Sequence, residues 1–463
     1  MLSGQNGILN RAVEAKEKTE ISSEKENISL ALTLCKMDKE EKTIDKNSLE
    51  KALKSQIGKN EEVKITSNGN DSFVIEFTKM GKVYYIEGTG EIVEESEVTK
   101  IETINDLKEF RDEVNSGNSF KNKIVSLKND IVIDEKWIPI GNETNKFEGT
   151  FIGNNHTINI NINSNENNIG LFGVNSGNIY SLGILGEIIG NEFVGGLVGK
   201  NYGNIFNSYN EANIKSISTS SNPYVGGIAG KSFSGIINTS YNKGVIQSNY
   251  FSTGGITGGT ENTTVKNCYN LGTVSGNGQV GGIVGRIINS YVYNCYNVGV
   301  IRSSNSSTGG IVGQDVNNSY ISNCINVGEI YGISNTGGII GGLNGKIEKC
   351  YNTGKVIGNG TTGGIVGFAI NNSLISNCYN KAEIQGKTEE KPEASVGGIV
   401  GSSDIGIIGC LWYSDNIEYA IGNLKETDGF SSDLVIPEIL EIVNSENKFK
   451  ESNDGKYPIL EWQ

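Results

Sequence analysis

The sequence predicts a mainly β protein, in which a parallel and right-handed β-helix solenoid follows a small α+β domain. The pentapeptide Gly-Gly-apolar-x-Gly recurs eight times at intervals of about 28 residues. The chain has 62 Gly and only 5 Pro, and the apolar positions of the repeats are mostly Ile and Val, which favours three short strands per unit over helices. Such a unit cannot enclose a core, whereas stacked units bury a continuous one. The repeats begin at Gly195, Gly226, Gly254, Gly281, Gly309, Gly337, Gly363 and Gly397.

The first hundred residues differ from the repeats in composition and predict a separate domain. Residues 1–100 contain 15 Lys or Arg and 19 Asp or Glu, whereas residues 165–410 contain 13 of each. Apolar residues recur at helical spacing within residues 5–38, and a second short helix follows Asn47. Alternating segments at residues 63–66, 73–77 and 83–86 then predict a small antiparallel sheet.

The remainder of the chain is expected to have three parts. Residues 101–164 form an N-terminal cap and the first coils, residues 165–410 form the repeats, and residues 411–463 form a C-terminal cap. Caps are needed because the end coils of a solenoid would otherwise expose unpaired strand edges. Roughly ten or eleven coils, spaced about 4.8 Å apart as paired strands are, give a solenoid about 50 Å long.

A second string, Asn-Cys-Tyr-Asn-x-Gly, runs in phase with the glycine pentapeptide. Because coils stack, equivalent residues are expected to lie in rows along the solenoid axis. Buried Asn amides in such a row can hydrogen-bond from coil to coil. Connections between parallel strands favour right-handed coiling. The predicted asparagine ladder is Asn210, Asn242, Asn270, Asn297, Asn326, Asn352 and Asn380.

The 7 cysteines predict a row of free thiols. No C-x-x-C pair is present, so the spacing typical of zinc sites is missing. Stacking brings neighbouring cysteines within disulfide distance, but their parallel Cα–Cβ directions make the disulfide torsion difficult. We therefore expect small, buried, apolar side chains, with Cys410 after the ladder and Cys35 on the apolar face of the first helix. The predicted cysteine ladder is Cys268, Cys295, Cys324, Cys350 and Cys378.

A stripe of tyrosines is the candidate binding surface. If the stripe faces outward, its rings and hydroxyls can contact sugar rings or a partner chain. If it faces inward, it belongs to the core, and the strand pattern leaves both alternatives open. The stripe consists of Tyr209, Tyr241, Tyr269, Tyr296, Tyr351 and Tyr379, and Ile325 interrupts it.

The Gly-Gly-Ile-Val-Gly units and the interleaved Asn-Cys-Tyr-Asn-x-Gly strings resemble the GLUG-repeat family of bacterial surface and secreted proteins. Segments at residues 137–141, 147–158 and 170–173, and the ending at residues 457–463, look like those that usually flank the family's repeats. The resemblance covers about residues 101–463. It implies a β-helix displayed outside the cell, often in adhesins or beside peptidase domains.

The N-terminal domain resembles another class of protein. Residues 3–12 and the following Ala-Lys-Glu-Lys-Thr-Glu are similar to the segment after the membrane helix in type IV pilin-like proteins of low-GC Gram-positive bacteria. The resemblance implies a pilin-like headpiece at residues 1–100. Two explanations are open: the sequence begins at an internal Met, or the natural chain has no leader. We expect the first, with a membrane helix upstream of Met1.

No catalytic, cofactor-binding or metal-ligating residue is predicted. Between Gly195 and Gly401 the only Asp is Asp315, whereas glycoside hydrolysis needs a carboxylate pair and calcium-assisted elimination needs a cluster. The single histidine, His156, lies in a segment that looks structural and is accompanied by no GxSxG. The formal net charge of -14 argues against nucleic acid as a partner.

The expected function is that of a non-enzymatic, extracellular adhesin, or of a structural component of a pilus-like or envelope assembly. The expected partners are a glycan, a host or cell-surface protein, or pilus and envelope components, and no cofactor is expected. The alternative is a polysaccharide-processing β-helix enzyme, either a lyase or a hydrolase. Release of products from a glycan favours the enzyme, whereas retention without release favours the binding protein.

Overall fold

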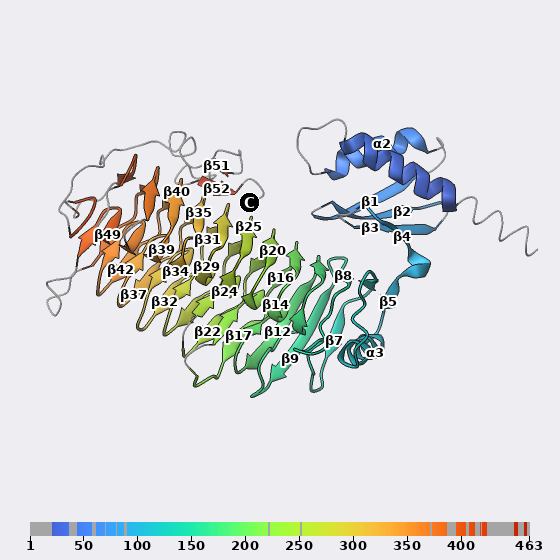
Figure 1. Cartoon of the computed structure of the whole chain (residues 1–463), viewed down its shortest axis with the longest axis horizontal. Helices are drawn as coiled ribbons and strands as arrows, with labels where there is room; N and C mark the ends of the chain where they lie inside the picture. Colours follow the sequence, from blue (N-terminus) through green and yellow to red (C-terminus); the bar gives the residue numbers. More distant parts are fainter. Residues whose placement is uncertain are drawn as a thin grey trace, which may run out of the picture. The chain divides into compact units, whose positions relative to one another are not determined.

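The computed structural model describes residues 21–36, 44–57, 62–69, 71–79, 81–87, 90–220, 223–250, 252–370, 373–386, 395–403, 407–412, 417, 419–423, 449–451 and 458–460. The chain divides into two compact units, Met1–Thr99 and Lys100–Gln463. The first unit is α+β and the second is a solenoid of parallel strands (Figure 1). Among the described residues, no helix has the length and apolar character needed to cross a bilayer.

The N-terminal unit packs two helices against one antiparallel sheet. Residues 21–36 are helical, and α2 (Lys46–Gln56) begins at Asp45, whose side chain accepts a hydrogen bond from Ser48 N. The predicted helix at residues 5–38 otherwise lies outside the described residues. The sheet order is β1-β2-β3-β4, and β4 was not predicted. These strands are β1 (Val63–Gly69), β2 (Ser72–Phe77), β3 (Lys82–Ile86) and β4 (Ile92–Glu94).

The core of this unit comes from one face of each helix and one face of the sheet. Ile28 and Leu49 are fully buried together with Phe73 and Tyr84. The Tyr84 hydroxyl donates to the carboxylate of Glu24, so the buried polar end of the tyrosine is paired. The unit therefore has its own hydrophobic core, as a separate domain needs.

A typical coil of the solenoid contains five short strands, more than the three that the sequence predicts. One coil consists of β23 (Ser252–Gly254), β24 (Thr257–Glu261), β25 (Thr263–Lys266), β26 (Tyr269–Asn270) and β27 (Val274–Gly276). Corners with positive φ and paired glycines interrupt the extended segments, which makes the strands shorter. The solenoid has about 11 turns, and equivalent strands of successive coils pair in parallel (Figure 1).

Stacked β-branched side chains fill the interior. Ile237, Val265 and Val292 follow one another in register on three successive coils, and none is exposed. Full burial of each such side chain contributes about 1.5–3 kcal/mol. Because the row continues from coil to coil, each coil completes the core of its neighbours.

Near the start of the solenoid unit, β5 (Thr99–Ile101) joins its 11-stranded sheet, and α3 (Ile104–Asn115) supplies aromatic packing to the first coils. Thr103 caps this helix and Asp106 completes a capping box. The ring of Phe110 contacts Phe120 and Phe147, with centroid distances of 4.9 Å and 5.5 Å. Part of the region expected to be the N-terminal cap is therefore a helix that packs on the first coils.

At the other end, β50 (Leu411–Trp412) is the last strand of the parallel coils, and beyond it Ile421 still forms a parallel bridge with Val400. Trp412 pairs in register with Asn380, so an indole takes the next position after the last ladder amide. Farther along the chain, β51 (Phe449–Glu451) and β52 (Pro458–Leu460) form an antiparallel pair. Most of the predicted cap at residues 411–463 lies outside the described residues.

One corner of each coil holds its residue in the left-handed backbone region. In this region the Cβ atom of most residues lies too close to the following carbonyl oxygen. Gly has no Cβ, and Asn is tolerated because its short polar side chain can hydrogen-bond locally. Five of the seven consecutive corners carry Asn, whereas the other two carry Thr239 and Lys349. The corner residues, with φ between 49° and 53°, are Asn207, Thr239, Asn267, Asn294, Asn323, Lys349 and Asn377.

We expect Lys349→Asn to stabilise the protein by about 1 kcal/mol, because Asn adopts this conformation at lower cost than Lys. Lys349 has a φ of 53° and is the matching residue to Asn323 one coil earlier. Urea unfolding of the two proteins measures the difference. Lys349→Ala is the control, since it removes the lysine but retains the strained backbone. An equal gain from Lys349→Ala would assign the effect to the lysine charge instead.

Candidate functional site

The asparagine ladder lies inside the solenoid. Asn297 Nδ2 donates to Asn326 Oδ1 at 2.8 Å and to Gly299 O at 2.9 Å, and neither asparagine is exposed. In every pentapeptide except the last, the second glycine packs against this ladder: a Cβ on Gly282 would lie 2.5 Å from Asn297 Cγ. The two motifs occur in phase because they touch. The amides join Asn210, Asn242, Asn270, Asn297, Asn326, Asn352 and Asn380 from coil to coil.

The cysteine ladder is also internal. The six solenoid cysteines are free thiols and are buried, and Cys35 in the N-terminal unit is buried as well. The thiols bond to local carbonyls: Cys268 Sγ lies 3.1 Å from Lys266 O, and Cys295 Sγ lies 3.3 Å from Tyr293 O. Burial raises the pKa of the Cys268 thiol well above its ordinary value. Because every one of these thiols is buried and out of reach of a substrate, the cysteines are packing residues rather than nucleophiles.

We expect no solenoid thiol to react with a water-soluble thiol reagent while the protein is folded. The reagent must reach a thiolate, and both the burial and the raised pKa of Cys268 oppose this. Labelling followed by mass spectrometry, with and without denaturant, measures the protection. Complete labelling of Cys295 in the folded protein would contradict the buried ladder.

The stripe of tyrosines forms a third ladder, the tyrosine ladder. Its side chains point away from the solenoid interior, because each tyrosine alternates with an inward Cys or Ser and an inward Asn. The rings of Tyr209 and Tyr241 stack 4.9 Å apart at 2°, and those of Tyr241 and Tyr269 stack 4.7 Å apart at 18°. These three tyrosines are partly exposed. The remaining members of the candidate stripe are buried, namely Tyr296, Tyr351 and Tyr379.

Stacking limits what the tyrosine ladder can bind. A ring between two stacked neighbours has both faces covered, so it presents only its edge and its hydroxyl. Burial raises the pKa of Tyr209 and of Tyr241, so these hydroxyls remain protonated donors at neutral pH. The exposed tyrosines of the ladder therefore present hydroxyls and ring edges, rather than ring faces, to a sugar or a partner chain.

The single histidine, His156, and the buried Asp315 of the repeats are held by local contacts. His156 Nδ1 lies 3.2 Å from Asp130 Oδ1, which also accepts a hydrogen bond from Thr157 N. Asp315 is 2% exposed and accepts hydrogen bonds from Asn317 N and Ser319 N. Burial raises the pKa of the Asp315 carboxyl. Among the described residues, no three His, Cys, Asp or Glu side chains are grouped to hold a metal ion.

We expect the stability of Asp315→Asn relative to the natural protein to increase with pH. The folded pKa of Asp315 is raised, so its contribution to stability is complete below the unfolded pKa and is lost as the pH rises through the folded pKa. The substitution removes only this titration. Thermal unfolding of both proteins between about pH 4 and pH 7, the range above the ordinary Asp value, measures it. A constant difference across this range would contradict the raised pKa.

One sheet carries a row of varied side chains on its outer face. It has nine strands, ordered β10-β14-β19-β24-β29-β34-β39-β44-β49, and we call it the site sheet. Its strands besides β24 are β10 (Phe172–Asn175), β14 (Val198–Asn201), β19 (Ala229–Ser232), β29 (Val284–Ile288), β34 (Val312–Asn317), β39 (Ile340–Leu343), β44 (Val366–Ala369) and β49 (Val400–Ser403).

The residue directly after each glycine pentapeptide lies in this row. The following residue is buried each time, for example Ile287 after Arg286, so the row itself faces outward. The search for recurring residues missed the row because its members differ from coil to coil. Their fixed position after the pentapeptide is the signal that could have found them. We call Lys200, Lys231, Gly259, Arg286, Gln314, Gly342, Phe368 and Ser402 the outer row.

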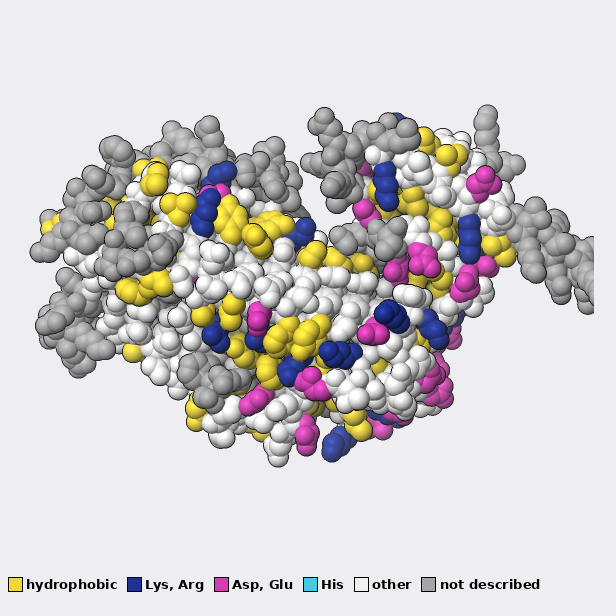
Figure 2. Space-filling view, in the orientation of Figure 1, with side chains coloured by type: hydrophobic (Ala, Val, Ile, Leu, Met, Phe, Trp, Pro, Cys, Tyr) yellow, Lys and Arg dark blue, Asp and Glu magenta, His cyan; other side chains and the backbone are white. Residues whose placement is uncertain are grey.

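Aromatic side chains flank the two lysines of the outer row, Lys200 and Lys231. Phe193 and Tyr224 stack 5.6 Å apart on one side, and Tyr202 and Phe233 stack 4.9 Å apart on the other. Lys231 Nζ lies 4.9 Å from the Tyr224 ring centroid and 4.3 Å from that of Phe233. Figure 2 shows hydrophobic side chains gathered with basic and acidic ones on the solenoid surface. This arrangement gives cation–π contacts at the surface.

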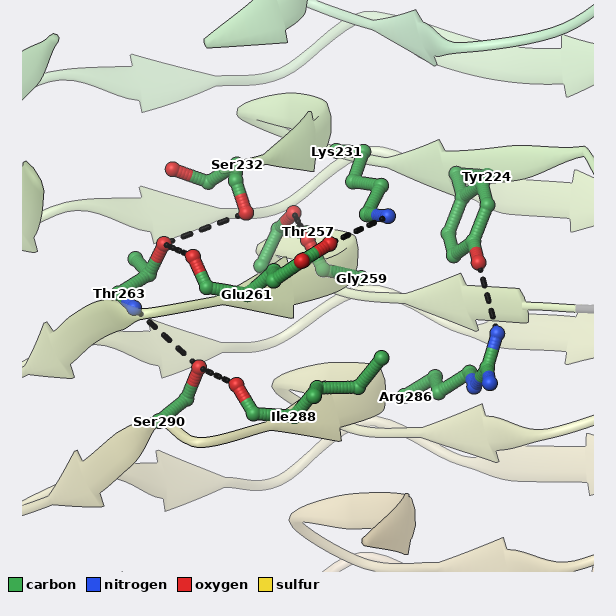
Figure 3. Close-up of polar contacts among 10 residues, drawn as sticks. All are labelled: Tyr224, Lys231, Ser232, Thr257, Gly259, Glu261, Thr263, Arg286, Ile288 and Ser290. Atoms are coloured by element: carbon green, nitrogen blue, oxygen red, sulfur yellow. Dashed lines mark hydrogen bonds and ion pairs between the residues drawn. The ribbon is translucent and has the colours of Figure 1, made fainter. Parts of the chain in front are cut away.

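Polar contacts fix these charges (Figure 3). Lys231 Nζ lies 3.3 Å from Glu261 Oε2, and Lys200 pairs with Glu143, which lowers the pKa of that carboxyl. Arg286 Nη1 donates to the Tyr224 hydroxyl at 2.9 Å, a contact that reaches past the coil of Gly259. The three cations of the outer row are therefore held in place by neighbouring rings and carboxylates.

Comparison with known families identifies one motif. Residues 358–385 match the GLUG motif. The match includes the pentapeptide at Gly363 and the string that contains Cys378 and Asn380. No curated protein matches the chain at a significant level.

A search of solved structures finds a crystal structure from Bacteroides ovatus, described as that of a candidate immunoglobulin A1 protease. The two chains are 20% identical with a TM-score of 0.44, and the alignment covers 80% of this chain and 94% of the other. Similarity at this level does not extend to function. The GLUG motif and the parallel solenoid together support the description of the chain as a GLUG-repeat β-helix protein.

Proposed function

We propose that the protein is a non-enzymatic, extracellular binding protein that acts as an adhesin and presents the site sheet to a glycan or to a protein on another surface. The outer row carries this proposal. Its side chains are varied and face outward, whereas the neighbouring inward positions are filled by packing residues and hydrogen-bonded ladders. Variation on a regular scaffold is the pattern expected where recognition, rather than folding, determines the residue.

The flanking rings support a binding role. Aromatic and cationic side chains are the groups that most often dominate recognition surfaces. Lys200 and Lys231 are already held by rings and by carboxylates, so little side-chain freedom is lost when a ligand binds. Rigid side chains of this kind favour retention of a ligand.

The N-terminal unit supplies the proposed attachment. Its order of helix and then antiparallel sheet agrees with the pilin-like resemblance of residues 1–100. We propose that this unit joins the solenoid to a pilus-like or envelope assembly. Display at a distance from the cell would then be the role of the solenoid.

A glycan array and a cell-binding assay with the full chain test the proposal. We expect retention on at least one glycan or cell surface without release of soluble product. The double variant Lys200→Gln/Lys231→Gln should weaken this retention. The control Tyr291→Ser changes an exposed residue on a different sheet and should retain binding. Depolymerisation of a retained glycan would favour the enzyme instead, and absence of any retention would contradict the binding role.

A further inference from the structure

Part of the tyrosine ladder is buried although its side chains point outward. Each of them alternates along the strand with an inward Cys and an inward Asn, so it is directed away from the core. Four consecutive positions of the row, including the isoleucine that interrupts the tyrosines, nevertheless have exposed fractions of only 0% to 3%. We call Tyr296, Ile325, Tyr351 and Tyr379 the covered positions.

The coils themselves do not provide this cover, as the start of the same ladder shows. Tyr351 and Tyr379 stack 5.2 Å apart, which is wider than the 4.9 Å and 4.7 Å found earlier in the ladder. Stacking hides ring faces and leaves ring edges to water. The edges of Tyr209, Tyr241 and Tyr269 are accordingly partly exposed, whereas those of the covered positions are not. An additional segment of chain must therefore lie over one part of the ladder only.

The burial at Tyr351 indicates the chemistry of the covering segment. The Tyr351 hydroxyl is buried and has no hydrogen-bond partner among the described residues. Burial also raises the pKa of this phenol well above its ordinary value. A polar segment would pair with a buried hydroxyl, because an unpaired one costs free energy. The segment that meets Tyr351 is therefore apolar.

The covering segment belongs to this chain, because the burial is present in a single molecule. The covered positions lie on the last coils before β50, and residues 424–463 follow those coils. Figure 1 shows the hairpin of β51 and β52, which is part of this C-terminal end, alongside the coils rather than beyond the last one. The covered strands are β31 (Tyr296–Asn297), β36 (Ile325–Asn326), β41 (Tyr351–Asn352) and β46 (Tyr379–Asn380).

The C-terminal end has the composition that the covered positions require. Residues 434–443 contain seven Leu, Val or Ile, and residues 433–446 contain four Asp or Glu and no Lys or Arg. Lysines border the covered positions: Lys349 precedes Tyr351 by two residues, and Lys381 follows Tyr379 by two. Neither lysine forms an ion pair with a described residue. Apolar residues flanked by acidic ones match an apolar row flanked by lysines.

We propose that the covered positions are the docking surface for the chain's own C-terminal end, and that the apolar residues 434–443 pack on them. The acidic residues of the same segment then lie near Lys349 and Lys381. This inference does not depend on the proposed binding function, because the outer row lies on a different sheet. It implies that only Tyr209, Tyr241 and Tyr269 of the ladder remain available to another molecule.

Hydroxyl-radical footprinting of the full chain, read for each tyrosine by mass spectrometry, tests the proposal. In the natural protein we expect Tyr351 and Tyr379 to be modified at least tenfold more slowly than Tyr209. The variant Ile439→Asp/Leu440→Asp places two charges in the apolar segment and should accelerate modification of Tyr351 and Tyr379 at least fivefold. Unreactive solenoid cysteines in the same variant would show that the coils remain folded.

Val132→Asp/Ile138→Asp is the matched control for this variant. It makes the same kind of change at two exposed apolar residues near the other end of the solenoid, and it should leave Tyr351 and Tyr379 protected. Equally fast modification of Tyr351 and Tyr209 in the natural protein would overturn the proposal, since no cover would be present.

A charge reversal at the border gives a second measurement that does not alter the apolar segment. Lys381→Glu changes an exposed side chain and should accelerate modification of Tyr379 at least twofold, because acidic residues of the C-terminal end are then repelled. Lys215→Glu reverses an exposed charge far from the covered positions and should have no effect. Unchanged protection in both Ile439→Asp/Leu440→Asp and Lys381→Glu would show that the C-terminal end is not the cover and would overturn the inference.

Discussion

Gly282→Ala is expected to destabilise the solenoid by roughly 3 kcal/mol or more, because overpacking against atoms that cannot move is costly. The added Cβ would lie 2.1 Å from Gly310 O and 2.5 Å from Asn297 Cγ. Gly310 O belongs to the backbone of the next coil, so relief of the clash requires the two coils to separate. Urea unfolding monitored by circular dichroism measures the loss.

Gly342→Ala is the matched control for this prediction. It makes the same chemical change within β39, whereas Gly282 lies in the bend between β28 (Val280–Gly281) and β29. The Cβ added at Gly342 would meet nothing closer than 3.4 Å. We expect a change within about 0.5 kcal/mol, as is usual for substitutions without a specific clash. Similar losses in both variants would show that the strands require glycine for backbone reasons and not for space at Gly282.

Asn297→Ala should have the second largest effect, a loss of about 2–4 kcal/mol, since unpaired buried polar groups cost about 1–3 kcal/mol each. The substitution removes the acceptor of Asn270 Nδ2 and the donor to both Asn326 Oδ1 and Gly299 O. All of these groups are buried, so water cannot replace the lost partners. Thermal and urea unfolding measure the change.

The exposed Asn305 provides the control for the ladder. Asn305→Ala removes the same amide from a side chain that lies at the surface, and it should change stability by less than about 0.5 kcal/mol. If Asn297→Ala were as mild as Asn305→Ala, the amide ladder would contribute little to the solenoid. The glycines of the pentapeptides would then be the main reason for the regular coil.

The recurring features of the fold could be predicted from the sequence. The glycine pentapeptide and the Asn-Cys-Tyr-Asn string predict parallel coils, and the structure has Asn270 and Asn297 in register with an amide contact of 2.8 Å. Recurrence predicts such contacts because identical residues at equal intervals occupy equivalent places in a stacked coil. The additional strand β4 and the division of each coil into five strands were not predicted, since they depend on local bends.

The candidate site was largely missed. The sequence draws attention to the tyrosines because they repeat, yet Tyr351 and Tyr379 are buried and the exposed rings cover one another's faces. The outer row does not repeat, so periodicity gives no reason to select Arg286 or Phe368. Their position after the pentapeptide becomes informative only when the outward direction of that position is known.

The sequence by itself determined the repeating unit, its extended character and the inward asparagine and cysteine ladders, because each depends on which residues recur and at what spacing. Only the tertiary structure decided which outward side chains are open. Arg286 reaches Tyr224 across 62 positions of sequence, and a Cβ at Gly259 would lie 2.6 Å from the Tyr224 ring, whereas a Cβ at Gly342 would meet nothing closer than 3.4 Å. These differences arise from neighbours on adjacent coils, whose side chains vary without a pattern along the chain.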